Sequence, residues 1–135
     1  MPSIQNLVLK DRQATPVNHT FTPRTVSGGE GVVGEAAASG TAVGENRISI
    51  RARISAGNRR KVDQKMTFRK VAMSTVNGVE VPTIVGSSYV TITYDWDPNF
   101  TEAERNNIQG QVEDSQKVTQ VLVYNTVVKG ETVYG

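Results

Sequence analysis

The residues with the clearest chemical potential are the basic side chains between positions 46 and 71. This segment holds nine Lys and Arg residues against a single acid, Asp63, whereas the rest of the 135-residue chain carries six basic and twelve acidic residues. Such a charge asymmetry within a small chain is typical of a surface that binds a polyanion, and nucleic acid is the usual candidate. The formal net charge of only +2 conceals this local excess.

The sequence offers little for catalysis. His19 is the only His and there is no Cys, so a Ser-His triad, a thiolate metal site and a disulfide all lack partners. Residues 29–34, GEGVVG, match G-x-G-x-x-G literally, but no apolar strand precedes them and the following residues form a poor helix. A small phosphate-handling enzyme built on this segment is the weaker alternative. We expect no enzyme activity, no cofactor, no metal ion and no small-molecule substrate.

Three alternating segments are expected to position the basic residues. In residues 47–55, isoleucines and Ala52 alternate with Arg and Ser; residues 61–69 and 88–96 continue the same pattern. Alternation of this kind predicts half-buried strands, which we expect to be antiparallel neighbours with one apolar face and one polar face. The polar face would carry Arg47, Arg51, Arg53, Arg59, Lys61, Lys65 and Arg69.

This polar face suits single-stranded nucleic acid. Its cations would contact phosphates and release counterions, and Tyr89 offers a ring on which an unpaired base can stack. Two plainer interpretations remain open: basic side chains often only solvate a sheet, and an exposed Tyr on a strand often packs against its cross-strand neighbour.

Turn and strand signals predict the structure of the segments on either side of the central strands. Residues 4–9 and 17–21 predict an N-terminal hairpin whose second strand Pro23 closes. Residues 25–44 predict an irregular connection with one short strand near 31–33. Residues 71–86 predict a protruding loop or hairpin around Asn77-Gly78.

The C-terminal part begins with a helix signal. Thr101-Glu102-Ala103-Glu104 forms a capping box, so a helix is expected to start there and to be available as cover for the apolar face. Residues 118–124 fit a second short helix or a strand equally well. The chain length suits one domain, and no apolar stretch predicts a membrane span or an export signal.

The order of these elements carries a family resemblance. The segments NRISI (46–50), NRRK (58–61), YVTIT (89–93) and TEAER (101–105) resemble those of the coat proteins of small single-stranded RNA bacteriophages, the leviviruses. The resemblance is closest over residues 45–105, and the chain length suits the whole family domain. It implies a single coat-protein domain over 1–135, with an N-terminal hairpin (1–23), a central basic sheet (45–96) and a C-terminal helical region (101–126).

The resemblance also implies an architecture and a function. It predicts an α+β fold, with an N-terminal β-hairpin and antiparallel β-sheet followed by C-terminal helices, that dimerises into one continuous sheet. Homodimers would assemble in the bacterial cytoplasm into an icosahedral virion shell of triangulation number three, package the RNA genome, and bind one RNA stem-loop to repress replicase translation. No membrane partner is implied. The alternative is a free RNA-binding regulator that uses the same basic sheet without a shell.

The resemblance also implies which residues form the RNA-binding site, position by position. Phosphate contacts are expected from Arg59, Lys61 and Lys65, base stacking from Tyr89, and hydrogen bonds to base or sugar from Ser49, Thr67 and Thr91. The full expected RNA-binding set is Arg47, Ser49, Arg51, Arg59, Lys61, Lys65, Thr67, Tyr89 and Thr91. Asp63 and Thr91 depart from the family pattern, which implies either a different RNA hairpin or weak sequence recognition with general packaging retained.

Overall fold

The computed structural model describes residues 2–36 and 43–134. The chain forms two compact units, Met1–Asp95 and Trp96–Gly135. The first unit contains the sheet, except for the last residue of its final strand, and the second contains the helices. In the described part of the chain, no helix has the length and apolar character needed to span a membrane.

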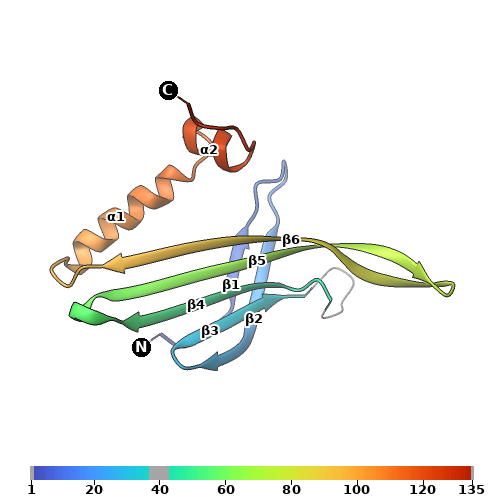
Figure 1. The fold of residues 1–135 in the computed structure, drawn as a ribbon, viewed down its shortest axis with the longest axis horizontal. Helices are drawn as coiled ribbons and strands as arrows, with labels where there is room; N and C mark the ends of the chain where they lie inside the picture. The colour runs from blue at the N-terminus through green and yellow to red at the C-terminus, as the bar shows by residue number, and fades with distance from the viewer. Residues whose placement is uncertain (1, 37–42, 135) are drawn as a thin grey trace. The chain divides into compact units, whose positions relative to one another are not determined.

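A six-stranded sheet forms the first unit, with the strands side by side in chain order (Figure 1). The strands are β1 (Leu7–Lys10), β2 (Asn18–Ser27), β3 (Glu30–Glu35), β4 (Asn46–Ile54), β5 (Arg60–Val76) and β6 (Val79–Trp96). Consecutive strands from β1 to β5 pair antiparallel, and β5 and β6 form a long hairpin that extends beyond β4 (Figure 1). The predicted antiparallel sheet is therefore confirmed, and it is larger than the three central strands because the N-terminal hairpin and β3 join it.

The central strands agree with the alternation of the sequence. Strand β4 matches the predicted segment 47–55 within one residue at each end. The segment 71–86 is a hairpin, since β5 runs to Val76 and β6 starts at Val79. Asn77 and Gly78 both have positive φ, 51° and 78°, which is the backbone geometry of a tight type I′ turn and explains the Asn-Gly pair.

Two predictions at the N-terminal end were wrong. Pro23 does not close β2, which continues to Ser27, because the pairing with β3 shifts register between Pro23 and Thr25. Such an irregularity accommodates a residue that has no backbone N–H. The described first part of the predicted connection 25–44 is not a loop either: β2 continues to Ser27, and the short strand predicted near 31–33 is part of β3, which pairs with β2 and β4 on its two sides. Residues 37–42 of the predicted connection lie outside the described residues.

The core of the sheet unit lies on one face. Phe21, Val33 and Ile48, from three adjacent strands, are buried, and Ile4, Leu7, Leu9, Met66 and Phe68 pack around them. We call this side of the sheet the apolar face. Farther along the same face the apolar side chains are open, with 45% of Ile50 and 72% of Ile54 exposed.

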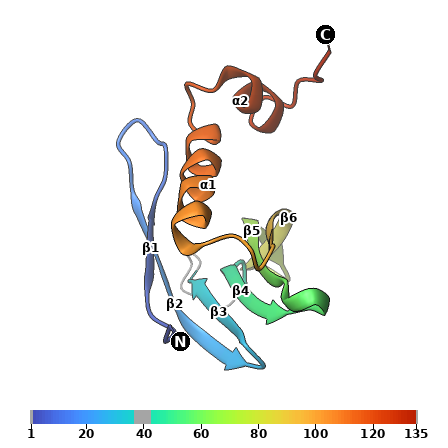
Figure 2. The same ribbon diagram turned by 90° about the vertical axis from the view of Figure 1, so that its left-hand side faces the viewer.

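The second unit contains two helices (Figure 2). Helix α1 (Glu102–Ser115) starts at the predicted capping box: the Glu104 amide donates to Thr101 Oγ1 at 3.2 Å, and Thr101 Oγ1 donates to Glu104 Oε1 at 3.0 Å. The ambiguous segment 118–124 contributes to a helix, α2 (Val121–Val127). Neither helix has a buried residue.

Candidate nucleic-acid interface

The register of β4 and β5 gathers the predicted basic residues on one face. Residues directly opposite each other in an antiparallel pair project to the same side of the sheet. The opposed pairs are Arg47 with Thr67, Ser49 with Lys65, Arg51 with Asp63, and Arg53 with Lys61. The intervening positions pair Ile48 with Met66 and Ala52 with Val62, which belong to the apolar face. We call the side that carries Arg51 and Asp63 the polar face.

Strand β6 contributes to the same face. Thr93 Oγ1 donates a hydrogen bond to Asp63 Oδ1 at 3.1 Å, which places Thr93 on the polar face. Because side chains alternate along a strand, Tyr89 and Thr91 project to that side as well. Tyr89 is 73% exposed, so its ring is open to an approaching base.

Arg59 is placed differently from the other expected residues. It follows the short 3-10 turn Ala56–Asn58, just before β5, and its Nε donates to Asp95 Oδ1 at 2.9 Å. Arg59 is expected to contact phosphate, but the sequence does not predict that a carboxylate from β6 pairs with it. Arg59 would have to exchange this partner, or share it, in order to bind RNA.

Ion pairs divide the cations of the polar face into two groups. Arg53 Nη1 lies 3.1 Å from Asp63 Oδ2, and Arg47 Nε lies 3.2 Å from Glu45 Oε1. Within residues 2–36 and 43–134, Arg51, Lys61 and Lys65 have no carboxylate at salt-bridge distance. These three side chains therefore provide positive charge that no direct ion pair engages, although Asp63 lies opposite Arg51.

A buried carboxylate that the sequence did not predict, that of Glu45, holds the start of β4. Glu45 is 7% exposed, and its Oε1 accepts hydrogen bonds from Arg24 Nε at 2.9 Å and Arg47 Nε at 3.2 Å. The Arg24 hydrogen bond is the main reason that the pKa of Glu45 is lowered. A Cβ at Gly34 would collide with this carboxylate, so a larger residue there would displace the Glu45 side chain. The sequence feature that points to this contact is Gly34, a glycine within a strand.

His19 lies on the apolar side of the sheet, and each of its ring nitrogens contacts a carboxylate. It lies opposite Leu9 in the β1–β2 pair, two residues from buried Phe21. Its Nε2 is 2.8 Å from Asp11 Oδ2 and its Nδ1 is 2.9 Å from Glu35 Oε2. The hydrogen bond to Asp11 is the largest cause of the raised pKa of His19. This cluster ties the β1–β2 hairpin to β3 and does not belong to the polar face.

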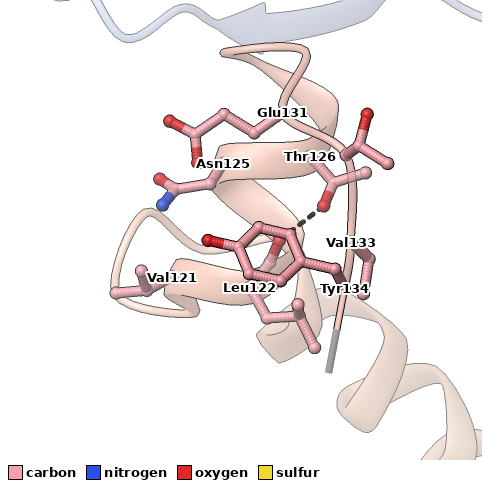
Figure 3. Close-up of a pocket in the computed structure, with 8 residues that line it drawn as sticks. Val121, Leu122, Asn125, Thr126, Glu131, Val133 and Tyr134 are labelled. Atoms are coloured by element: carbon pink, nitrogen blue, oxygen red, sulfur yellow. Dashed lines mark hydrogen bonds between the residues drawn. The ribbon is translucent and has the colours of Figure 1, made fainter.

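The second unit offers a weaker candidate. An open cavity of about 320 Å³ lies between α2 and residues 131–134, lined by the eight residues drawn in Figure 3. Its lining includes Val121, Leu122 and Val133, and the Thr126 hydroxyl donates within α2 to the Leu122 carbonyl at 2.9 Å (Figure 3). Among the described residues no three His, Asp or Glu side chains gather as a metal site.

The comparisons with known proteins identify the class. The levivirus coat protein family matches residues 2–134. The capsid protein of Pseudomonas phage PRR1 is 42% identical over 131 residues, covering 97% of this chain and 98% of that protein. The chain therefore belongs to the levivirus coat protein family.

Solved structures show the same fold. A virus-like particle of bacteriophage NT-214 has a TM-score of 0.82 at 23% identity, covering 98% of this chain and all of that one. The capsid protein of bacteriophage GA also has a TM-score of 0.82, at 20% identity and 98% coverage of both chains. These comparisons confirm the predicted RNA phage coat fold.

Membership in this family settles the broad function. The chain is a structural capsid protein of the virion, and not an enzyme, because its relatives are coat proteins.

Proposed function

We propose that this coat protein forms homodimers, assembles into an icosahedral shell and packages single-stranded RNA against its polar face. The observation that carries the proposal is a single sheet in which one side carries three cations outside any direct ion pair, Arg51, Lys61 and Lys65, and the other side carries open apolar side chains. The first side suits a polyanion and the second suits protein contact. The nine expected RNA-binding residues keep the roles that the family resemblance implies.

The sheet supports the dimer part of the proposal. Strand β6 is at the end of the sheet order and spans 18 residues, so one of its edges presents a long row of backbone groups without a strand partner among the residues that the structure describes. A long free edge favours pairing with another strand. Pairing of two β6 edges would join two sheets into one, and the open apolar face would be covered by the C-terminal helices of the partner copy. In this assembly residues 1–135 act as one coat-protein domain.

Two finer assignments follow from the resemblance. The dimer binds one RNA stem-loop near the replicase start, which represses translation and marks the genome for packaging. Assembly takes place in the bacterial cytoplasm into a shell of triangulation number three. The cationic polar face supports the RNA part of this assignment, because specific recognition of a loop needs both phosphate contacts and an exposed ring for a base.

Salt dependence tests the RNA-binding face. Lys61→Ala removes a cation of the polar face, so it should weaken RNA binding and reduce the slope of log affinity against log salt by about 0.7–0.9, or one phosphate contact. Lys70→Ala is the matched control, because Lys70 is on β5 at an apolar-face position, an even number of residues from Met66. Its slope should equal that of the unmodified protein. Equal slopes for all three proteins would remove Lys61 from the interface.

A further inference from the structure

The carboxylate of Asp63 is unexpected on a surface whose only role is to bind phosphates. It is the single acid in the segment 46–71, and it faces Arg51 across the β4–β5 pair. Lys61 and Lys65 are two residues away on either side of it along β5, on the same face. A carboxylate at this position repels phosphate and lowers the affinity that its neighbours provide. Its presence therefore calls for another role.

The geometry presents Asp63 as an oriented acceptor. Its Oδ2 accepts from Arg53 Nη1 and its Oδ1 accepts from Thr93 Oγ1, both at 3.1 Å. An ionised carboxylate has about four acceptor positions, so each oxygen keeps capacity for another donor. The side chain is 16% exposed, which leaves it reachable from the polar face. Anchors from β4 and β6 fix its orientation before any ligand arrives.

An acceptor-only group discriminates between bases. Cytosine carries an amino donor at ring position 4, where uracil carries a carbonyl acceptor. The amino group can donate to the Asp63 carboxylate, while the uracil carbonyl would face it with like partial charge. Unpaired bases in RNA loops present these edges to proteins. The surrounding cations hold the backbone, so the carboxylate is left to contact a base.

We propose that Asp63 is a specificity-determining residue of the polar face, which selects an unpaired base with an amino group, such as cytosine, over uracil. This inference rests on the proposed RNA-binding function. A purely structural role, in which Asp63 only neutralises Arg53, would change stability and overall affinity, but it would not alter the relative affinity for two bases.

The test compares binding of 12-nucleotide oligocytidylate and oligouridylate to the full-length protein, at concentrations below particle formation as checked by light scattering. Asp63→Asn keeps the size of the side chain and adds an amide donor that can pair with uracil. Asp95→Asn is the matched control, because it removes one negative charge and weakens one Arg ion pair at 2.9 Å on the neighbouring strand. Because the oligonucleotides are the same for all three proteins, differences in base stacking cancel.

The unmodified protein should prefer oligocytidylate by about fivefold or more. Asp63→Asn should bring the ratio of affinities close to one, whereas Asp95→Asn should raise both affinities and keep the ratio. No preference in the unmodified protein, or an unchanged ratio in Asp63→Asn, would overturn the assignment of Asp63. Absence of salt-dependent binding to either oligonucleotide would instead overturn the proposed function itself.

Discussion

At the scale of single residues, partners within the protein distinguish the cations of the polar face. The sequence predicts which residues share this face, because alternation along a strand is a local property. It does not predict that Arg53, Arg47 and Arg59 each face a carboxylate, since Asp63, Glu45 and Asp95 reach them through strand pairing or a turn. Arg51, Lys61 and Lys65 are therefore the stronger candidates for phosphate contacts.

Tyr89 gives a prediction at this scale that depends on its ring and not on its hydroxyl. The exposed ring should stack on an unpaired base, and such stacking contributes about 1–3 kcal/mol. Tyr89→Ala should lose this amount of binding free energy to a single-stranded RNA, whereas Tyr89→Phe should keep most of it. Fluorescence titration at fixed salt measures both variants. Equal losses in the two variants would argue against stacking.

At the scale of elements, sequence patterns succeeded where side chains alternate and failed where glycine or a bulge hides the period. Strand β4 and the start of α1 were predictable from isoleucine spacing and the capping box. The strand predicted near 31–33 is confirmed as the middle of β3, but its full extent was not predicted because the glycines of EGVVGE remove the alternating side chains, and Gly34 leaves room for the Glu45 carboxylate. The continuation of β2 past Pro23 depended on a register shift that only pairing reveals.

The attachment of the β1–β2 hairpin gives a prediction about pH. Both ring nitrogens of His19 face carboxylates, so the doubly protonated ring satisfies both contacts. Because folding raises the pKa of His19, its stabilisation is complete below the unfolded value of about 6.5 and is lost as pH rises through the folded value. The pKa of Asp11 is held far below normal, chiefly by the Val17 amide, so its contribution is lost only in strong acid.

Urea unfolding of the unmodified protein and His19→Gln measures this effect. The difference in free energy of unfolding between them should be largest near pH 5 and should shrink steadily toward pH 9. Asp114→Asn is a suitable control, since its ion pair with Lys117 involves no histidine and persists over this range. A difference for His19→Gln that is the same at both pH values would show that the imidazolium does not hold the hairpin.

At the scale of the whole molecule, the sheet unit leaves apolar side chains uncovered. Among the described residues only three hydrophobic side chains are buried, and Ile50, Ile54 and Val90 remain open on the apolar face. Burial of these side chains by a second copy would stabilise the fold, at about 25 cal/mol for each Å² of apolar surface removed from water. Helix α1 does not supply an independent core either, because none of its residues is buried. We propose that folding and self-association are coupled.

The most direct test of the capsid assignment is size-exclusion chromatography of the protein expressed in bacteria, followed by electron microscopy and nuclease treatment of the leading peak. We predict closed, uniform particles that elute at megadalton size and protect RNA from digestion. A stable species of one or two 14.7 kDa chains that binds RNA but forms no particles would contradict the account and would favour a free RNA-binding regulator.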